Sequence, residues 1–126
     1  MQMQDYKIKN FTDLLVWQRG HKLVIDIYKL TNNFPKEERF GLTDQLRRAS
    51  VSFTSNIAEG FGRDKFNDKS HFYTMALGSL YEIQNQLLIA KDIKYINNKE
   101  CDILFNECIE ISKMCTKLIK KIREFA

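Results

Sequence analysis

Three cysteines are the residues in this chain best suited to chemistry, but their spacing argues against a disulfide or a zinc site among them. Cys101, Cys108 and Cys115 recur every seven residues. In a helix that rises ~1.5 Å per residue, neighbouring members lie ~10.5 Å apart. That separation exceeds the ~7 Å between Cα atoms that a disulfide allows, and it is too large for one zinc ion with bonds of ~2.3 Å to sulfur. We therefore expect three buried, reduced thiols that pack as small apolar residues.

Other residues suited to catalysis or metal binding are sparse. His21 and His71 fall in separate predicted helices, and neither belongs to the Glu-x-x-His motif of a di-iron bundle. The segment Gly60-Phe61-Gly62 lacks the lysine and the preceding strand of a phosphate-binding loop, and its glycines suit the end of a helix. We expect no catalytic residue, no metal and no cofactor. An enzyme or metal protein is a third hypothesis, motivated only by the cysteine and histidine content.

Positive charge is concentrated in one segment. The net charge is +4, and residues 111–126 hold five basic residues against one acidic, whereas the rest of the chain holds 15 of each. Lys113, Lys117 and Lys120 share one side of a helix because they lie at i, i+4 and i+7, and Lys121 and Arg123 flank them. Such a stripe can follow a phosphate backbone. Cations near a helix C-terminus also complement the helix dipole, and both interpretations stay open for a monomer.

A second group of polar residues lies in the middle of the chain. Arg47, Arg48 and Arg63 are candidates for nucleic-acid binding or for salt bridges. Glu59 is the acidic candidate for such a salt bridge within this helix and loop. Alternatively, Asn56 and Glu59, three residues apart, form a buried polar network that fixes the register of their helix, and we prefer this structural role.

Four helices must position these side chains, and the apolar spacing predicts each of them. The first begins with Thr12 as its cap and ends near Asn33, before Pro35, with Phe11 packing on Val16. The second covers roughly residues 40–62, ends at its two glycines and buries one apolar stripe, namely Leu42, Leu46, Ala49, Phe53 and Ile57.

The third and fourth helices are longer. The third is capped by Asn67 or Asp68 and runs to about Lys94, and its internal Gly78 suggests a close helix crossing. The fourth, capped by Asn98, carries a 3-4 heptad stripe that we expect to face the core, namely Cys101, Leu104, Cys108, Ile111, Cys115, Leu118, Ile122 and Phe125.

Short connections favour antiparallel neighbours, so we predict an all-α, up-down-up-down four-helix bundle. Residues 1–126 fit one domain, and residues 1–10 are expected to form a flexible tail. An alternative is a pair of helical hairpins that completes its core only on oligomerisation. No signal peptide and no run of ~18 apolar residues is visible, so we expect a cytoplasmic protein with no membrane contact.

Some apolar residues exceed what one bundle buries. Exposed contiguous apolar surface usually marks an interface. We therefore predict a homo-oligomer whose interface candidates are Ile103, Ile109, Tyr73, Leu77 and Tyr81.

Several motifs in a fixed order add a family resemblance. They are Leu15-Val-Trp-Gln18, Tyr28-x-x-Thr31-x-x-Phe-Pro35, Phe40-Gly-Leu-x-x-Gln45-x-Arg-Arg-Ala49, Asn56-Ile-Ala-Glu-Gly-x-Gly-Arg63 and Phe72-x-x-x-Ala76-x-Gly-Ser79 with Glu82. Over residues 11–120 the chain resembles the bacterial four-helix bundle proteins related to those encoded in 23S ribosomal RNA intervening sequences. It departs from that pattern at Gly20, where alanine is expected, and at Phe53-Thr54, where isoleucine paired with serine or proline is expected.

The resemblance implies an up-down bundle that assembles as a ring-shaped homopentamer. It also implies kinship with the accessory proteins of diversity-generating retroelements, basic pentamers that bind nucleic acid and a reverse transcriptase. The leading hypothesis is a non-enzymatic oligomeric bundle that binds RNA, or a ribonucleoprotein or nucleic-acid-processing partner, through basic surface. The second is a protein-interaction scaffold with no nucleic-acid role.

Overall fold

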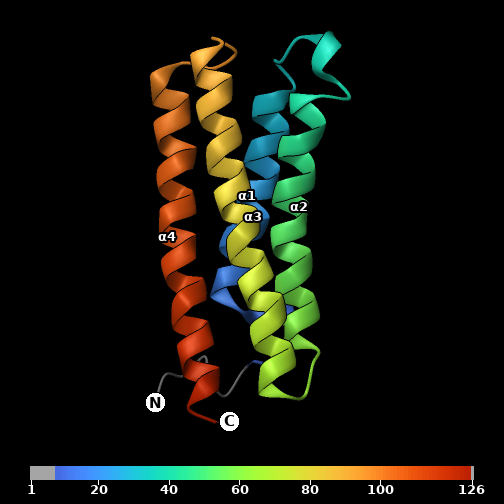
Figure 1. Ribbon diagram of the computed structural model, residues 1–126, viewed down its shortest axis with the longest axis vertical. Coiled ribbons are helices and arrows are strands. Elements are labelled where there is room, and N and C mark those ends of the chain that lie inside the picture. Colours follow the sequence, from blue (N-terminus) through green and yellow to red (C-terminus); the bar gives the residue numbers. More distant parts are fainter. Residues whose placement is uncertain (1–7, 126) are drawn as a thin grey trace.

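Four long helices run side by side and alternate in direction in the computed structural model, which describes residues 8–125 (Figure 1). They are α1 (Leu15–Thr31), α2 (Leu42–Phe61), α3 (Phe66–Asp92) and α4 (Asn98–Arg123), with two short 3-10 turns, η2 (Phe11–Asp13) and η3 (Lys36–Glu38). No strand occurs within residues 8–125. The predicted all-α four-helix bundle is confirmed, and because one chain closes its own core, the alternative of incomplete hairpins is wrong.

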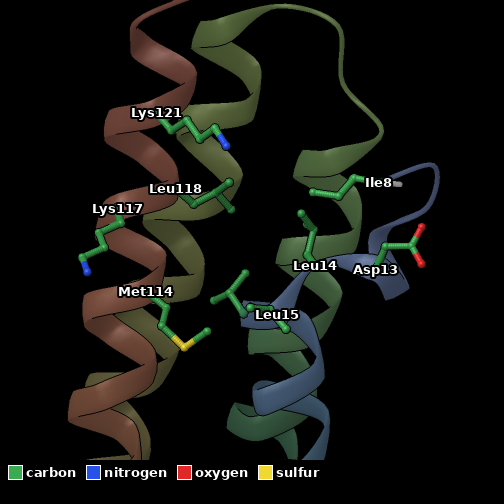
Figure 2. A pocket seen from close by; sticks show the side chains of 9 residues that line it. Ile8, Asp13, Leu14, Leu15, Met114, Lys117, Leu118 and Lys121 are labelled. Atoms are coloured by element: carbon green, nitrogen blue, oxygen red, sulfur yellow. The ribbon is translucent and has the colours of Figure 1, made fainter. Parts of the chain in front are cut away.

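The chain enters α1 later than predicted. Leu14, rather than Thr12, is the residue before α1, and it provides no side-chain cap. Asn10 caps η2 instead, because its side chain accepts from the Thr12 N–H at 3.2 Å while Asp13 accepts from the Asn10 N–H at 3.1 Å. Leu14 then has extended backbone and buries its side chain facing α4 (Figure 2). The predicted tail, residues 1–10, lies mostly outside the described residues, but Ile8 packs against the core. Phe11 packs edge-on against the Trp17 ring, with the ring centroids 5.3 Å apart.

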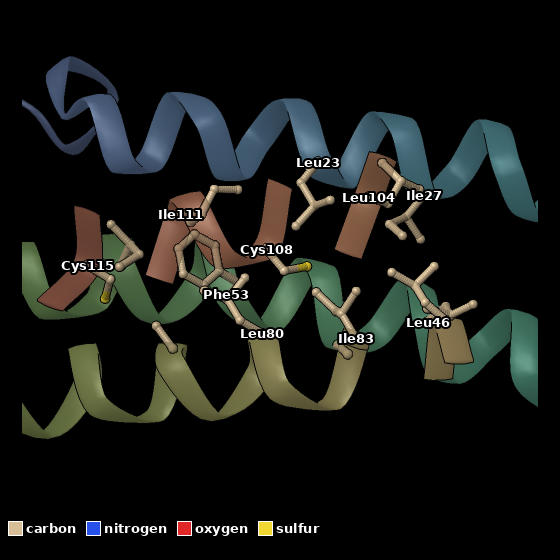
Figure 3. Close-up of a cluster of buried hydrophobic side chains, with 14 of the residues drawn as sticks. Leu23, Ile27, Leu46, Phe53, Leu80, Ile83, Leu104, Cys108, Ile111 and Cys115 are labelled. Carbon is tan, nitrogen blue, oxygen red and sulfur yellow. The ribbon is translucent and has the colours of Figure 1, made fainter. Parts of the chain in front are cut away.

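The apolar stripes of all four helices meet in one core (Figure 3). The five predicted core residues of α2 are all buried, among them Phe53 and Ile57. All three cysteines are buried and free, as predicted. Burial raises the pKa of Cys108 and Cys115 to about 12, so neither thiol ionises at neutral pH.

The inward stripe of α4 departs from the predicted heptad near its end. Ile119 is buried, whereas Leu118 and Ile122 are half-buried and Phe125 is 80% exposed. A straight helix drifts ~20° per heptad relative to a 3.5-residue repeat. Over the roughly two and a half heptads from Cys101 to Leu118, that drift turns Leu118 away from the core and brings Ile119 into it.

The predicted helix boundaries are shifted by one to three residues. Lys65 precedes α3 without a side-chain cap, so neither Asn67 nor Asp68 has that role. Asn97 replaces Asn98 as the cap of α4 and forms a capping box with Glu100. The third helix ends at Asp92 because Lys94 adopts the left-handed region at φ 70°, and the Tyr95 N–H bonds the Ala90 carbonyl at 2.9 Å, which is a Schellman motif.

Close packing between α2 and α3 depends on small residues. A Cβ on Gly60 would lie 2.6 Å from Tyr73 Cε1, so glycine is needed there for contact, and Gly62 ends α2 with an ordinary negative φ of −76°. The second helix therefore ends at these glycines, as predicted, although neither has a positive φ. Ser79 and Ser52 join the two helices through a hydrogen bond of 3.0 Å between their hydroxyls.

Gly78 does not mark a close crossing within the chain. It is exposed, and a Cβ built on it would meet no atom within 4 Å. The predicted crossing is wrong for the single bundle, because the outer side of α3 faces no other helix at this point.

The two departures from the family pattern lie against each other. A Cβ on Gly20 would lie 2.4 Å from Cε2 of Phe53 and 3.3 Å from Cγ2 of Thr54. Phe53 is fully buried, so its ring cannot move aside without disturbing the core. The larger side chain on α2 therefore requires the missing side chain on α1.

This contact predicts strong coupling between positions 20 and 53. Gly20→Ala and Phe53→Ile should each lower the free energy of unfolding by ~1–3 kcal/mol, the first through overpacking and the second through a cavity. The double variant should lose ~1–2 kcal/mol less than the sum, because the smaller side chain makes room for the methyl group. Urea unfolding at one protein concentration measures the cycle. Gly78→Ala is the control and should be neutral or stabilising, whereas additive losses at positions 20 and 53 would contradict the contact.

One carboxylate joins the two connections at the end of the bundle opposite the α2–α3 loop. Glu38 Oε1 accepts from the Leu42 N–H at 2.9 Å, which caps α2, and its Oε2 accepts from the Tyr95 hydroxyl at 2.8 Å. The bond from the Leu42 N–H, then that from Tyr95, lowers the pKa of Glu38.

Glu38 should therefore make the fold sensitive to acid. Because its pKa is lower in the folded chain, its contribution is fully present at neutral pH and is lost as the pH falls through its folded pKa. Glu38→Gln should lower the thermal midpoint at about pH 7 and converge on the unmodified protein near about pH 3. Thermal melts followed by circular dichroism measure this, with Glu37→Gln as a control of equal charge. A constant difference across the pH range would refute the linkage.

Candidate nucleic-acid interface

The excess positive charge lies at the end of the bundle where α4 finishes. The α2–α3 loop lies at the same end (Figure 1), and the Arg123 guanidinium lies 5.9 Å from the centroid of the Phe66 ring at the start of α3. Two segments far apart in the sequence therefore bring their cations together. We name this surface the basic end and define it by Arg63, Lys65, Lys117, Lys120, Lys121 and Arg123.

The cations of α4 are unequally engaged. Lys113 pairs with Glu110 at 3.2 Å on its own helix. Lys117 and Lys120 are exposed, and neither forms an ion pair or hydrogen bond with any residue in the range 8–125. These two lysines are therefore the part of the predicted stripe that has no acidic neighbour within bonding distance.

The cations of the α2–α3 loop have structural partners. Arg63 pairs with Glu59 at 3.1 Å, and its guanidinium lies 4.8 Å from the Phe72 ring centroid. Lys69 donates from Nζ to the Gly60 and Phe61 carbonyls at 3.2 and 2.8 Å, and burial lowers its pKa. Lys69 thus satisfies the last carbonyls of α2, a role that the sequence did not suggest because its partners lie across a turn.

Arg47 and Arg48 lie apart from the basic end. They lie on α2, 16 and 15 residues before Arg63, so roughly 23 Å away. Arg47 lies over the Tyr28 ring at 4.5 Å and donates to Thr31 Oγ1 at 2.9 Å, which ties α2 to the last turn of α1. Arg48 is exposed and pairs with Asp44 at 2.9 Å. The structure therefore divides the predicted nucleic-acid residues into two groups.

The predicted polar network of Asn56 and Glu59 does not form. Asn56 donates to the carbonyl and the hydroxyl of Ser52, at 2.9 and 3.2 Å, one turn earlier on α2. Glu59 is exposed and pairs with Arg63. Each side chain instead bonds along its own helix, Asn56 one turn back to Ser52 and Glu59 one turn forward to Arg63.

The residues predicted to form an oligomer interface differ in their exposure. Tyr73 is only 1% exposed and packs in the core, so its assignment to an interface is wrong. Leu77 and Ile109 are half-buried, while Tyr81 and Ile103 are 68% and 57% exposed. The ring of Tyr73 fills the space that Gly60 leaves, and this tertiary neighbour was invisible in the helical spacing of α3.

An apolar groove of about 320 Å³ lies between the start of α1 and the end of α4. Leu14, Leu15, Met114 and Leu118 line it, and Lys121 extends across its upper edge (Figure 2). Farther along these helices, Arg19 and Glu107 form two hydrogen bonds of 2.9 and 2.7 Å that join α1 to α4. Glu107 thereby raises the pKa of Arg19.

Groups of catalytic or metal-binding side chains are not assembled here. Within residues 8–125 no cluster of three or more His, Cys, Asp or Glu side chains is placed to hold a metal ion. The helices in the same range are too short or too polar for any of them to cross a bilayer.

By its fold and its surface charge, this chain is a four-helix bundle protein with basic residues gathered at one end. Residues 12–117 match the sequence pattern of the 23S rRNA-intervening sequence protein family. The chain belongs to this family, which confirms the predicted resemblance.

Solved structures agree on the fold. One is the crystal structure of a protein of unknown function from the S23 ribosomal protein family of Bacteroides thetaiotaomicron. It is 23% identical and superposes with a TM-score of 0.75, covering 84% of this chain and 99% of that one. At this identity the likeness supports the bundle alone. No curated protein matches the chain.

Proposed function

We propose that this protein is a non-enzymatic, cytoplasmic oligomer that binds RNA, or the RNA of a ribonucleoprotein partner, at the basic end. The observation that carries the proposal is the pair Lys117 and Lys120, exposed and without acidic partners in the described chain. Phosphate groups neutralise such cations and release counterions, which favours binding.

The helix dipole does not account for the whole stripe. Lys120, Lys121 and Arg123 lie in the last turn of α4, where the carbonyl groups carry partial negative charge. Lys117 lies a turn earlier, and the dipole effect falls off within the last turn. A lysine at that position is explained better by a ligand than by helix stability.

Assembly would strengthen the basic end. Leu77, Tyr81 and Leu88 share one face of α3, and the last two are exposed. Gln84 lies between them and donates to the Phe105 carbonyl at 3.4 Å, so this face borders α4. Copies joined here into a ring, with the bundle axes along the symmetry axis, would place every basic end on one rim. The family resemblance favours five copies.

Neutralising the two unpartnered lysines should weaken RNA binding. Lys117→Gln with Lys120→Gln should lower the affinity for an RNA hairpin about tenfold or more at ~50 mM salt, and should reduce the slope of log affinity against log salt by about 1–2. Fluorescence anisotropy across a salt series measures both quantities.

Lys36→Gln with Lys99→Gln provides the matched control. It removes the same charge from exposed positions at the opposite end of the bundle. Equal losses in both double variants would place binding elsewhere, and no binding by the unmodified protein at ~50 mM salt would remove the proposal.

The α3 face should mediate assembly. Light scattering should give the unmodified protein a mass of about 75 kDa, five times the 14.9 kDa of one chain. Tyr81→Glu with Leu88→Glu should reduce that mass, because it places charge in an apolar contact. Phe40→Glu, at an equally exposed ring on the α1–α2 connection, should leave it unchanged. A monomeric mass for the unmodified protein would refute assembly.

A second candidate function is a protein-interaction scaffold. The apolar groove beside Leu15 and Leu118, with Lys117 and Lys121 on its lining, favours a partner segment that offers an apolar side chain among acidic residues. A partner that stays bound after RNA is digested would support the scaffold over RNA binding.

A further inference from the structure

Aromatic rings are interleaved with the cations at the basic end. Three phenylalanine rings there have a cation over one face: Arg63 over Phe72, Lys69 over Phe61 and Arg123 over Phe66, at 4.8, 5.5 and 5.9 Å from the ring centroids. All three rings are half-buried. These pairs hold the cations in place and leave little ring surface for a ligand.

Phe125 differs from these three rings. It follows the last turn of α4 and is 80% exposed, and no ring or cation in residues 8–125 lies against it. Exposure alone means little, since single apolar residues are common on protein surfaces. Its position is the informative feature, because Phe125 lies eight residues after Lys117, roughly 12 Å along the helix, with Lys120, Lys121 and Arg123 between them.

An exposed ring among cations fits unpaired nucleotides. The lysines attract the phosphates, while an aromatic side chain offers a face on which a base can stack. In a duplex each base face is already covered by its neighbours, and the A-form grooves display only edges and sugar hydroxyls. Away from the ends of a duplex, only an unpaired base has a face free for Phe125.

The opposite end of the bundle has a ring but no excess charge. Phe40 is 85% exposed and lies under the Arg39 guanidinium at 5.2 Å. The preceding residues 36–39 hold two basic and two acidic side chains. At this end a base could stack on the Phe40 ring, but there is no excess positive charge to attract the RNA phosphates. Phe40 therefore serves as a control for Phe125.

We infer that the basic end selects single-stranded RNA, with Phe125 stacking on a base while Lys117 and Lys120 contact the adjacent phosphates. The inference rests on the proposed function and narrows it from RNA in general to unpaired segments such as loops and ends. Recognition requires no base-specific hydrogen bond, so binding should tolerate many sequences.

Two RNAs of the same sequence test the inference. One is a strand of about 16 nucleotides without self-complementarity, and the other is that strand annealed to its complement. Phe125→Ala should weaken binding of the single strand about 5- to 100-fold and change duplex binding by less than about twofold. Phe125→Leu should weaken it similarly because it keeps apolar bulk without a stacking face, and Phe125→Tyr should bind like the unmodified protein.

Phe40→Ala is the matched control, and it should leave the binding of both RNAs unchanged. Unchanged single-strand binding by Phe125→Ala, together with a loss in the Lys117 and Lys120 variant, would overturn the stacking inference and leave the proposed function standing. Binding of neither RNA by the unmodified protein would overturn both. A smaller mass of Phe125→Ala by light scattering would show that the ring is covered by another copy of the chain, which also overturns the inference.

Discussion

The close contact between α2 and α3 is the packing on which the rest of the bundle depends. Gly60 lets the ring of Tyr73 lie against the α2 backbone, and Lys69 reaches back to the final carbonyls of α2. Together they fix where α2 stops and at what height α3 starts. The short loop between the two helices is placed by these contacts. The end of α4 lies beside this loop, where Arg123 contacts Phe66. The basic end exists because this connection holds its two halves in register.

The basic residues of this protein are of two kinds, those that bond other helices and those that do not, and the sequence alone does not distinguish them. Arg47, Arg19 and Lys69 hold helices together, through Thr31, Glu107 and the carbonyls of α2 respectively. Lys117 and Lys120 hold nothing together within the described chain. The first kind loses part of its hydration on folding, and its hydrogen bonds between helices offset that loss. The second kind contributes little to the fold, and these are the two cations on which the proposed function rests.

The sequence predicted the helices, the core and the buried cysteines because these follow from periodicity, which one chain segment contains by itself. It missed features that depend on two segments at once. Nothing along α3 distinguished Tyr73 from an exposed ring, since the space it fills is created by Gly60. The heptad in α4 misplaced Ile119 because a repeat of 3.5 residues falls progressively out of step with 3.6 residues per helical turn. Within the candidate site, the charge pattern of the sequence identified the lysines. Only the structure showed that Lys117 and Lys120 form no ion pair within residues 8–125.

The contact between Gly20 and Phe53 also constrains how this pair of positions can change. Alanine at position 20 beside the phenylalanine would force its methyl group against the ring, whereas isoleucine at position 53 beside the glycine would leave a void. Either single change costs stability, and the second change recovers part of it. Related chains with a phenylalanine at position 53 are therefore expected to have glycine at position 20.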